Sequence, residues 1–244
     1  MPAATPRIIG FDRKISLRWL DATAEWTAQG LAPPAIRGQL ERLLEGQVAG
    51  GGSRSARGKT TTVLLHVWTA VPDAVAPLRD DGLALLRGRG GRDRLPLHWG
   101  MCLATYPFFR DVAAATGRLL ALQGAAAQAQ IVRRMAESWG ERTTATRAVR
   151  RIVRSFVEWG VLVETGDRGT YAPAAKIPVA GVGAWLIEAG LVSSGRREYP
   201  FRALAAGAAF YPFDMTLSGQ DVSRNPRLEI CRQGLDEDVV MLNR

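Results

Sequence analysis

The residues best suited to binding chemistry in this sequence are four arginines spaced along one predicted helix. The run TTATRAVRRIVRSFVEWGVL repeats arginine at helical positions i, i+3, i+4 and i+7, namely Arg147, Arg150, Arg151 and Arg154. The opposite side of the helix carries apolar residues: Val149, Ile152, Val153 and Phe156. A planar guanidinium group can hold a phosphate or a guanine edge with two hydrogen bonds. The pattern therefore predicts a helix that packs on one side and binds an anion on the other.

The segment before this helix has the pattern of a helix-turn-helix. Residues 126–139 show apolar side chains at helical spacing, and Gly140 suits a C-cap or a turn. The hydroxyl of Thr143 or Thr144 can then N-cap the arginine helix. In a helix-turn-helix the second helix normally enters the major groove of DNA, so we expect both threonines and the arginine stripe to contact duplex DNA.

Two short runs of β-forming residues after the arginine helix predict a wing. Residues 161–164 and 170–172 flank the turn TGDRG, which places Arg168 at the tip of a hairpin beside the phosphate backbone. Residues 126–171 are therefore predicted to form a winged helix-turn-helix. This segment contains eight arginines and five acidic residues.

The charge of the whole chain favours a polyanionic partner. Its 244 residues include 32 basic and 23 acidic side chains, which gives a formal net charge of +9. All but three of the basic residues are arginine, a bias typical of GC-rich coding, so the positions of the arginines are more informative than their number. A solvated helix face paired with nearby carboxylates is the alternative explanation of the stripe.

A second set of basic residues lies in the segment GGGSRSARGKTT. A P-loop needs a glycine five residues before Gly58, and this chain has Ser53 there, so nucleotide hydrolysis is not expected. We expect a flexible loop in which Arg54, Arg57 and Lys59, at the start of a helix, contact phosphates without sequence preference. A solvated linker is the alternative.

No catalytic, metal or cofactor site is predicted. His66 and His98 lie on apolar helical stretches far from any acidic residue at useful spacing, so both are expected to be satisfied core or boundary histidines. Cys102 and Cys231 are distant in sequence and lie in no metal-ligand pattern, and Cys102 is expected to be buried. The expectation is a protein without enzymatic activity, bound metal or cofactor.

The elements that must position these residues are mostly helices. Apolar periodicity predicts helices over residues 15–29, 35–48, 60–70, 73–86, 97–105 and 107–123. The C-terminal part differs, with predicted helices over 182–189 and 201–209 and two β-rich runs in LEICRQGLDEDVVML. The expected fold is mainly α.

Three regions are expected along the chain. These are a helical N-terminal region (1–95), a winged helix-turn-helix-like region (96–176) and a mixed α/β C-terminal extension with a β-hairpin (177–244). We expect a cytoplasmic protein with no membrane partner, because no signal peptide is recognisable and no apolar run reaches the ~20 residues of a membrane span. Nothing in the sequence predicts the oligomeric state.

The order of motifs resembles the BrxA family of bacterial BREX phage-exclusion systems over roughly residues 15–165. The resemblance lies in the run LHWGMCLATYPFFRDVAAATGRLL, a polar helix, and then TTATRAVRRIVRSFVEWGVL. Its most specific points are Trp99, Cys102, Tyr106, Pro107, Phe109, Thr144, Arg147 and residues 160–162. The resemblance implies a small, non-catalytic, mainly helical DNA-binding accessory that works beside a methyltransferase and a large ATPase.

The expected function is therefore duplex DNA binding in an anti-phage defence complex. Two alternatives remain open: a transcriptional regulator that reads a specific operator, and a protein-assembly adaptor whose basic face meets an acidic partner. A regulator should dimerise and protect one short site. An adaptor should bind no DNA at physiological salt.

Overall fold

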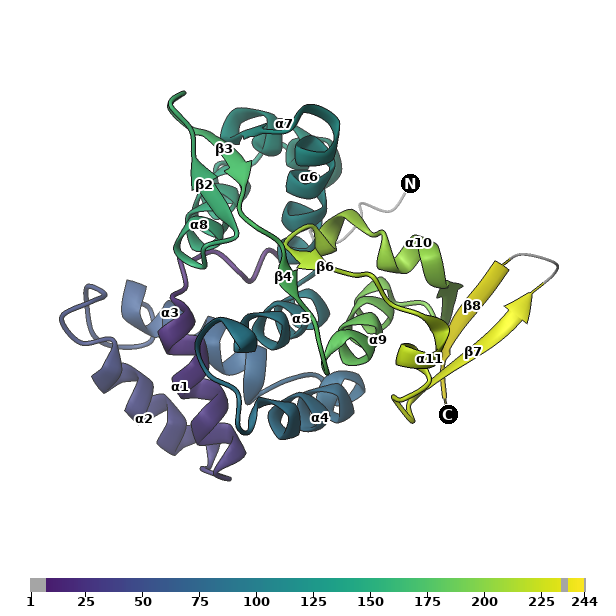
Figure 1. The fold of residues 1–244 in the computed structure, drawn as a ribbon. Helices are drawn as coiled ribbons and strands as arrows, with labels where there is room; N and C mark the ends of the chain where they lie inside the picture. The colour runs from purple at the N-terminus through teal and green to yellow at the C-terminus, as the bar shows by residue number, and fades with distance from the viewer. Residues whose placement is uncertain (1–7, 234–236, 244) are drawn as a thin grey trace, which may run out of the picture.

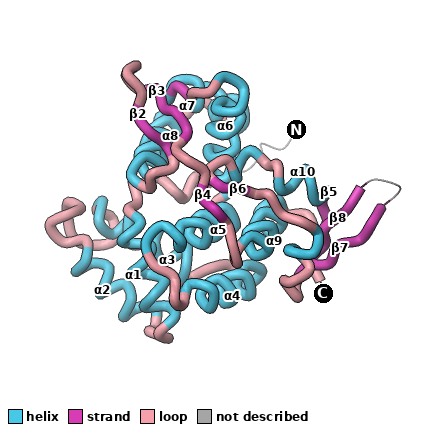
Figure 2. The backbone as a smooth tube through the Cα atoms, viewed as in Figure 1, coloured by secondary structure: helices cyan, strands magenta, loops and turns pink. Residues whose placement is uncertain are grey.

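The computed structural model describes residues 8–233 and 237–243, and the fold is mainly helical, as predicted (Figure 1). Strands are short and lie between the helices or near the C-terminus (Figure 2). The α-helices are α1 (Leu17–Ala28), α2 (Pro33–Leu43), α3 (Ala56–Trp68), α4 (Ala76–Leu86), α5 (Leu95–Thr105), α6 (Pro107–Gln123), α7 (Gln128–Trp139), α8 (Thr143–Glu158), α9 (Gly183–Ser194), α10 (Phe201–Ala205) and α11 (Gly219–Val222). The short 3-10 helices are η1 (Asp73–Val75), η2 (Gly91–Arg94) and η3 (Ala208–Phe210). The strands are β1 (Ala126–Ala127), β2 (Leu162–Glu164), β3 (Thr170–Pro173), β4 (Ile177–Pro178), β5 (Glu198–Pro200), β6 (Phe213–Asp214), β7 (Leu228–Gln233) and β8 (Glu237–Leu242).

Helix α3 begins earlier than the predicted helix over 60–70. It starts at Ala56, so Arg57 and Lys59 belong to a helix and not to the flexible loop that we predicted. Ser55 caps the helix by accepting a hydrogen bond from the backbone N–H of Gly58 at 3.1 Å. Gly58 allows the preceding loop to pack closely, because a Cβ there would lie 2.4 Å from the carbonyl oxygen of Gly52.

A three-stranded antiparallel sheet follows α6, with strand order β1-β3-β2. Residues 126–127 form β1, so our prediction that a helix begins at residue 126 is wrong at its first turn. These two alanines pair with Thr170 and Tyr171 of β3, and this long-range pairing overrides their local helical preference. Helix α7 starts immediately afterwards, and the Gln130 side chain accepts a hydrogen bond from the backbone N–H of Ala127 at 3.1 Å.

The start of α8 also differs from the prediction. Arg142 occupies the N-cap position with an extended backbone, and its side chain makes no capping hydrogen bond. The prediction that Thr143 or Thr144 is the N-cap is therefore wrong, because the turn after Gly140 is one residue shorter than we assumed. Both threonines lie exposed in the first turn of α8.

The C-terminal residues form two further small sheets and pack against the helices. Strands β4 and β6 pair in parallel, and β5, β8 and β7 form an antiparallel sheet in that order. The two β-rich runs predicted in this region are β7 and β8; residues 234–236 between them lie outside the described residues. Helix α9 packs against α5, which brings the C-terminal extension onto the centre of the molecule (Figure 1).

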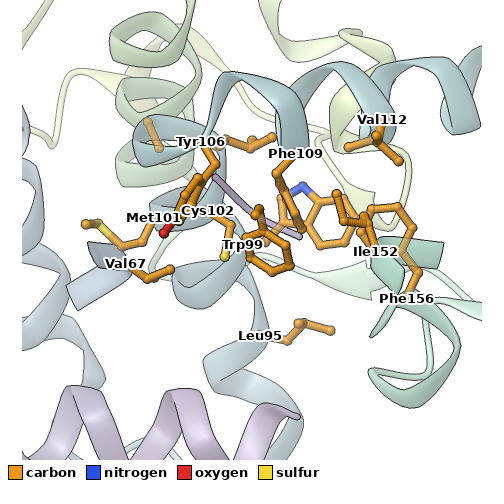
Figure 3. Close-up of a cluster of buried hydrophobic side chains, with 14 of the residues drawn as sticks. Val67, Leu95, Trp99, Met101, Cys102, Tyr106, Phe109, Val112, Ile152 and Phe156 are labelled. Atoms are coloured by element: carbon orange, nitrogen blue, oxygen red, sulfur yellow. The ribbon is translucent and has the colours of Figure 1, made fainter. Parts of the chain in front are cut away.

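Trp99 of α5 lies at the centre of the hydrophobic core (Figure 3). Its ring centroid lies 4.9 Å from that of Phe156 in α8, 5.2 Å from Phe109 in α6 and 5.7 Å from Phe213 in β6. The aromatic residues that we predicted to seat the arginine helix are all buried: Tyr106, Phe108, Phe109, Trp139, Phe156 and Trp159. One cluster of buried side chains thus contains residues from all three predicted regions.

Candidate nucleic-acid interface

Helix α8 is fixed in its rotation by its apolar side. Val149, Ile152, Val153 and Phe156 are fully buried, as predicted. Because the rings of Trp99 and Phe109 enclose Phe156, this side of α8 cannot turn outward (Figure 3). The opposite side of α8 consequently faces outward.

The four predicted arginines lie on that side of the helix, and three of them are fully open to solvent. Arg147, Arg150 and Arg154 are exposed, and none of them forms an ion pair with a carboxylate among the described residues. The alternative explanation of the stripe, a face neutralised by neighbouring carboxylates, does not apply to these three side chains. They form a row of positive charges open to an external anion.

Arg151 occupies a different environment from the other three. It is half-buried, and its Nη1 donates a hydrogen bond to the carbonyl oxygen of Asp12 at 2.7 Å. Burial lowers the pKa of the Arg151 guanidinium from its usual value, and repulsion from Arg13, Arg147 and Arg154 adds to this effect. Arg151 therefore ties the segment before α1 to α8 and is less accessible than its neighbours.

A groove of about 820 Å³ runs between α7 and α8 beside the exposed arginines. Its lining includes Arg133 and Glu137 of α7, Thr143 and Arg147 of α8, and the linking residues Glu141 and Arg142. We predicted from the sequence that Thr143 and Arg147 lie at the interface, but we did not predict Arg133. Its spacing is the signal that would have found it, because a residue two positions after the apolar Ile131 lies on the opposite side of a helix.

Strands β2 and β3 form the predicted hairpin, with Arg168 exposed in the turn. The hydroxyl of Thr165 organises this turn by donating to the carbonyl of Thr170 at 3.1 Å and accepting from the backbone N–H of Asp167 at 3.3 Å. Gly169 completes the turn with φ at +76°, a conformation that favours glycine. Arg168 is thus held on a short, defined loop, which contacts the start of α7 through a hydrogen bond from the backbone N–H of Gln128 to the carbonyl of Gly169.

The basic residues near α3 have different environments. Arg54 and Lys59 are exposed. Arg57 is half-buried, donates from Nε to the carbonyl of Val48 at 3.3 Å and lies 3.6 Å from the carboxylate of Glu45. Arg57 therefore stabilises the α2–α3 loop, whereas the exposed Arg54 and Lys59 are accessible to a phosphate.

The structure reveals a pair of a buried histidine and a half-buried aspartate that sequence spacing concealed. His98 is fully buried and accepts a hydrogen bond at Nδ1 from Trp68 Nε1 at 3.0 Å, so its Nε2 donates to Asp21 at 2.9 Å. Arg94 also binds Asp21, at 3.3 Å. Our prediction that His98 is a satisfied core histidine is confirmed, but the premise that no acidic residue lies near is wrong, because α1 brings one from 77 positions away.

The described part of the chain contains neither a metal site nor a membrane-spanning helix. Within it, no group of three or more His, Cys, Asp or Glu side chains is placed to hold a metal ion. Nor does any helix there combine the length and apolar character needed to cross a membrane. Cys102 is buried, as predicted, and burial raises the pKa of its thiol well above the usual value.

Comparison with known proteins adds no relative to this description. No protein-family model, no curated protein and no solved structure matches the chain.

Proposed function

We propose that this protein binds duplex DNA through the exposed side of α8. The observation that carries the proposal is the exposure of Arg147, Arg150 and Arg154 without carboxylate partners in the described part of the chain. Arginine grips phosphates and guanine edges with paired hydrogen bonds, and each neutralised phosphate releases a counterion, which favours binding.

The order of elements around α8 supports a winged helix-turn-helix. In this proposal α7 and α8 are the turn-linked pair, α8 enters the major groove, and the hairpin of β2 and β3 is the wing. The pairing of β1 with β3 supports this assignment, because it places the hairpin beside the helix pair. Arg168 then lies where a wing contacts the backbone.

We further propose that the protein is a non-catalytic accessory of a BREX-like defence system. This part rests on the resemblance to the BrxA family, of which Trp99, Tyr106 and Arg147 are among the most specific points. Its partners would then include a methyltransferase and a large ATPase. Co-purification of the tagged protein with the products of neighbouring genes tests this part separately from DNA binding.

Fluorescence anisotropy with a labelled duplex tests DNA binding directly. The variant Arg147→Ala/Arg150→Ala/Arg154→Ala should lose most of the affinity. The matched control is Arg42→Ala/Arg87→Ala/Arg202→Ala, which removes the same charge from three exposed arginines on other elements and should bind nearly as tightly as the parent. Equal losses in both variants would show that total charge, and not the α8 face, governs binding.

Two duplexes of unrelated sequence separate the alternatives. Backbone-dominated binding predicts similar affinity for both. A strong preference for one short site, together with dimer formation, would indicate a regulator. Absence of binding at physiological salt would indicate a protein adaptor.

A further inference from the structure

A second basic site lies beside α8, in a cleft of about 490 Å³ between three segments of the chain. The segment before α1 contributes Arg13 and Lys14, α8 contributes Arg151 and Glu158, and the α2–α3 region closes the other side. The charged groups that line the cleft are thus three cations and one carboxylate. None of the sequence patterns pointed to Arg13 or Lys14.

The cleft is preformed because the segment before α1 is fastened to α8 by hydrogen bonds. The backbone N–H of Ile15 donates to Ser155 Oγ at 2.9 Å, and Trp159 Nε1 donates to the carbonyl of Ile15 at 2.9 Å. Arg151 Nη1 donates to the carbonyl of Asp12 at 2.7 Å. These bonds fix the residues on both sides of Arg13 and Lys14, so a ligand would not need to order them first.

The cations of the cleft retain donors for a ligand, and its one carboxylate accepts a hydrogen bond from a neighbouring hydroxyl. Glu158 accepts a hydrogen bond from the hydroxyl of Ser16 at 2.6 Å. Lys14 is exposed. Arg13 Nη1 donates to the carbonyl of Asp12 at 3.3 Å. Its Nε is buried without a hydrogen-bond partner among the described residues and lies 3.7 Å from the Asp12 carboxylate. Such an unsatisfied guanidinium N–H is uncommon in folded proteins.

We propose that this cleft binds a phosphate group through Arg13, Lys14 and the accessible part of Arg151. A phosphate offers several strong acceptors to guanidinium and ammonium donors, and it neutralises like charges that otherwise repel one another. Arg151 lies on the same side of α8 as Arg147 and Arg154, so the cleft continues the exposed basic face. In the complex with DNA, the bound group is a backbone phosphate flanking the groove that α8 enters; this assignment of the source rests on the proposed function.

The variant Arg13→Ala/Lys14→Ala tests the site. Anisotropy with a duplex should show affinity reduced about tenfold or more at fixed salt. The slope of log K against log salt should become shallower by about one unit, because one phosphate contact is lost. The matched control is Lys176→Ala/Arg202→Ala, which removes one exposed lysine and one exposed arginine outside the cleft and should leave both quantities near those of the parent.

Circular dichroism checks that each variant is folded, and Lys14→Ala alone is a milder variant, because exposed substitutions usually change stability little. That single variant should show part of the same loss. If the parent binds DNA and the cleft and control variants behave alike, the cleft site is wrong while the proposed function stands.

Where the parent binds no DNA, titration of inorganic phosphate by calorimetry tests the cleft separately from the proposed function. If the parent binds no DNA but binds phosphate, and Arg13→Ala/Lys14→Ala does not, the proposed function fails and the cleft is a site for a small phosphate compound. If neither protein binds DNA or phosphate, the inference is overturned.

Discussion

Arg150 and Phe156 lie on the same helix but face opposite environments, and this contrast separates binding from folding at the level of single residues. Arg150 and its neighbour Arg154 are exposed, whereas Phe156 is fully buried. Exposed substitutions usually change the free energy of unfolding by less than about 0.5 kcal/mol, whereas truncating a buried phenylalanine costs about 3–5 kcal/mol.

We therefore expect Arg150→Ala/Arg154→Ala to weaken DNA binding while leaving the thermal midpoint nearly unchanged. Phe156→Ala should lower the midpoint strongly. Anisotropy measures the DNA affinity of each variant, and differential scanning calorimetry measures its thermal midpoint. Comparable unfolding in both variants would mean that the two sides of α8 have been assigned wrongly.

Asp21 gives the protein a specific sensitivity to acid. Burial acts to raise the pKa of Asp21, but the hydrogen bond from His98 and the contacts with Arg94 outweigh it, so this pKa lies below the usual value of 3.8. The unfolded chain therefore takes up this proton first as the pH falls. The ionised Asp21 carboxylate therefore stabilises the folded state above about pH 4. This stabilisation is lost as the pH falls from there through the lowered pKa.

The variant Asp21→Asn should consequently show a flatter decrease in the free energy of unfolding below about pH 4 than the parent. Urea denaturation at a series of pH values measures this dependence. Asp73→Asn, at an exposed position, is the control. An acid dependence in Asp21→Asn as steep as that of the parent would contradict the role assigned to the His98–Asp21 pair.

At the level of elements, the hairpin of β2 and β3, which we propose as the wing, should contribute one phosphate contact. Arg168 is exposed at the hairpin turn, beside Asp167, whose carboxylate is repelled by the negative potential of a narrow minor groove. We expect Arg168→Ala to weaken binding to A·T-rich and G·C-rich duplexes equally. The slope of log K against log salt should become shallower by about one unit. A larger loss of affinity for A·T-rich DNA would indicate that the arginine enters the minor groove. Unchanged affinity for both duplexes would show that the hairpin does not contact DNA.

The C-terminal extension packs against α6 through the short helix η3. Gly117 makes this contact possible, because a Cβ there would lie 2.0 Å from the carbonyl oxygen of Ala208. Gly117→Ala should therefore destabilise the protein by roughly 1–3 kcal/mol through overpacking. Gly38→Ala in α2, where a Cβ would meet nothing within 4 Å, should be neutral or stabilising by up to about 1 kcal/mol. Thermal denaturation distinguishes the two, and equal midpoints would contradict the close packing at Gly117.

Helices with strong apolar periodicity could be predicted from the sequence, but elements that depend on distant partners could not. The helix over 107–123 was predicted with the bounds of α6, because Pro107 and Gly124 mark its ends. Strand β1 has only two alanines, and its pairing with β3 is what makes it a strand. The N-cap of α8 was missed because the prediction relied on a capping hydroxyl, whereas Arg142 occupies this position without a capping hydrogen bond.

The site was predictable to the same extent. Arg147, Arg150 and Arg154 follow from helical spacing alone. The half-burial of Arg151 and the cleft around Arg13 and Lys14 do not, because they depend on hydrogen bonds between residues about 140 positions apart. Local pattern therefore identified the exposed face of α8 but not its neighbours in space.

At the level of the whole molecule, three surfaces around α8 carry an excess of positive charge. The exposed side of α8, the α7–α8 groove and the cleft beside the N-terminal segment each carry more cationic than acidic side chains in their linings. A duplex bound across these surfaces would make several phosphate contacts at once. Affinity should then depend steeply on salt.

The salt dependence of duplex binding tests this account most directly. Each neutralised phosphate contributes about −0.9 to the slope of log K against log salt, so about four to six contacts should weaken binding by roughly a hundredfold or more between 50 and 200 mM salt. Anisotropy titrations of the parent across this range should give that slope, and Arg147→Ala/Arg150→Ala/Arg154→Ala should give a clearly shallower one. A flat response of the parent, or no binding at 50 mM salt, would contradict the proposal that this protein binds DNA.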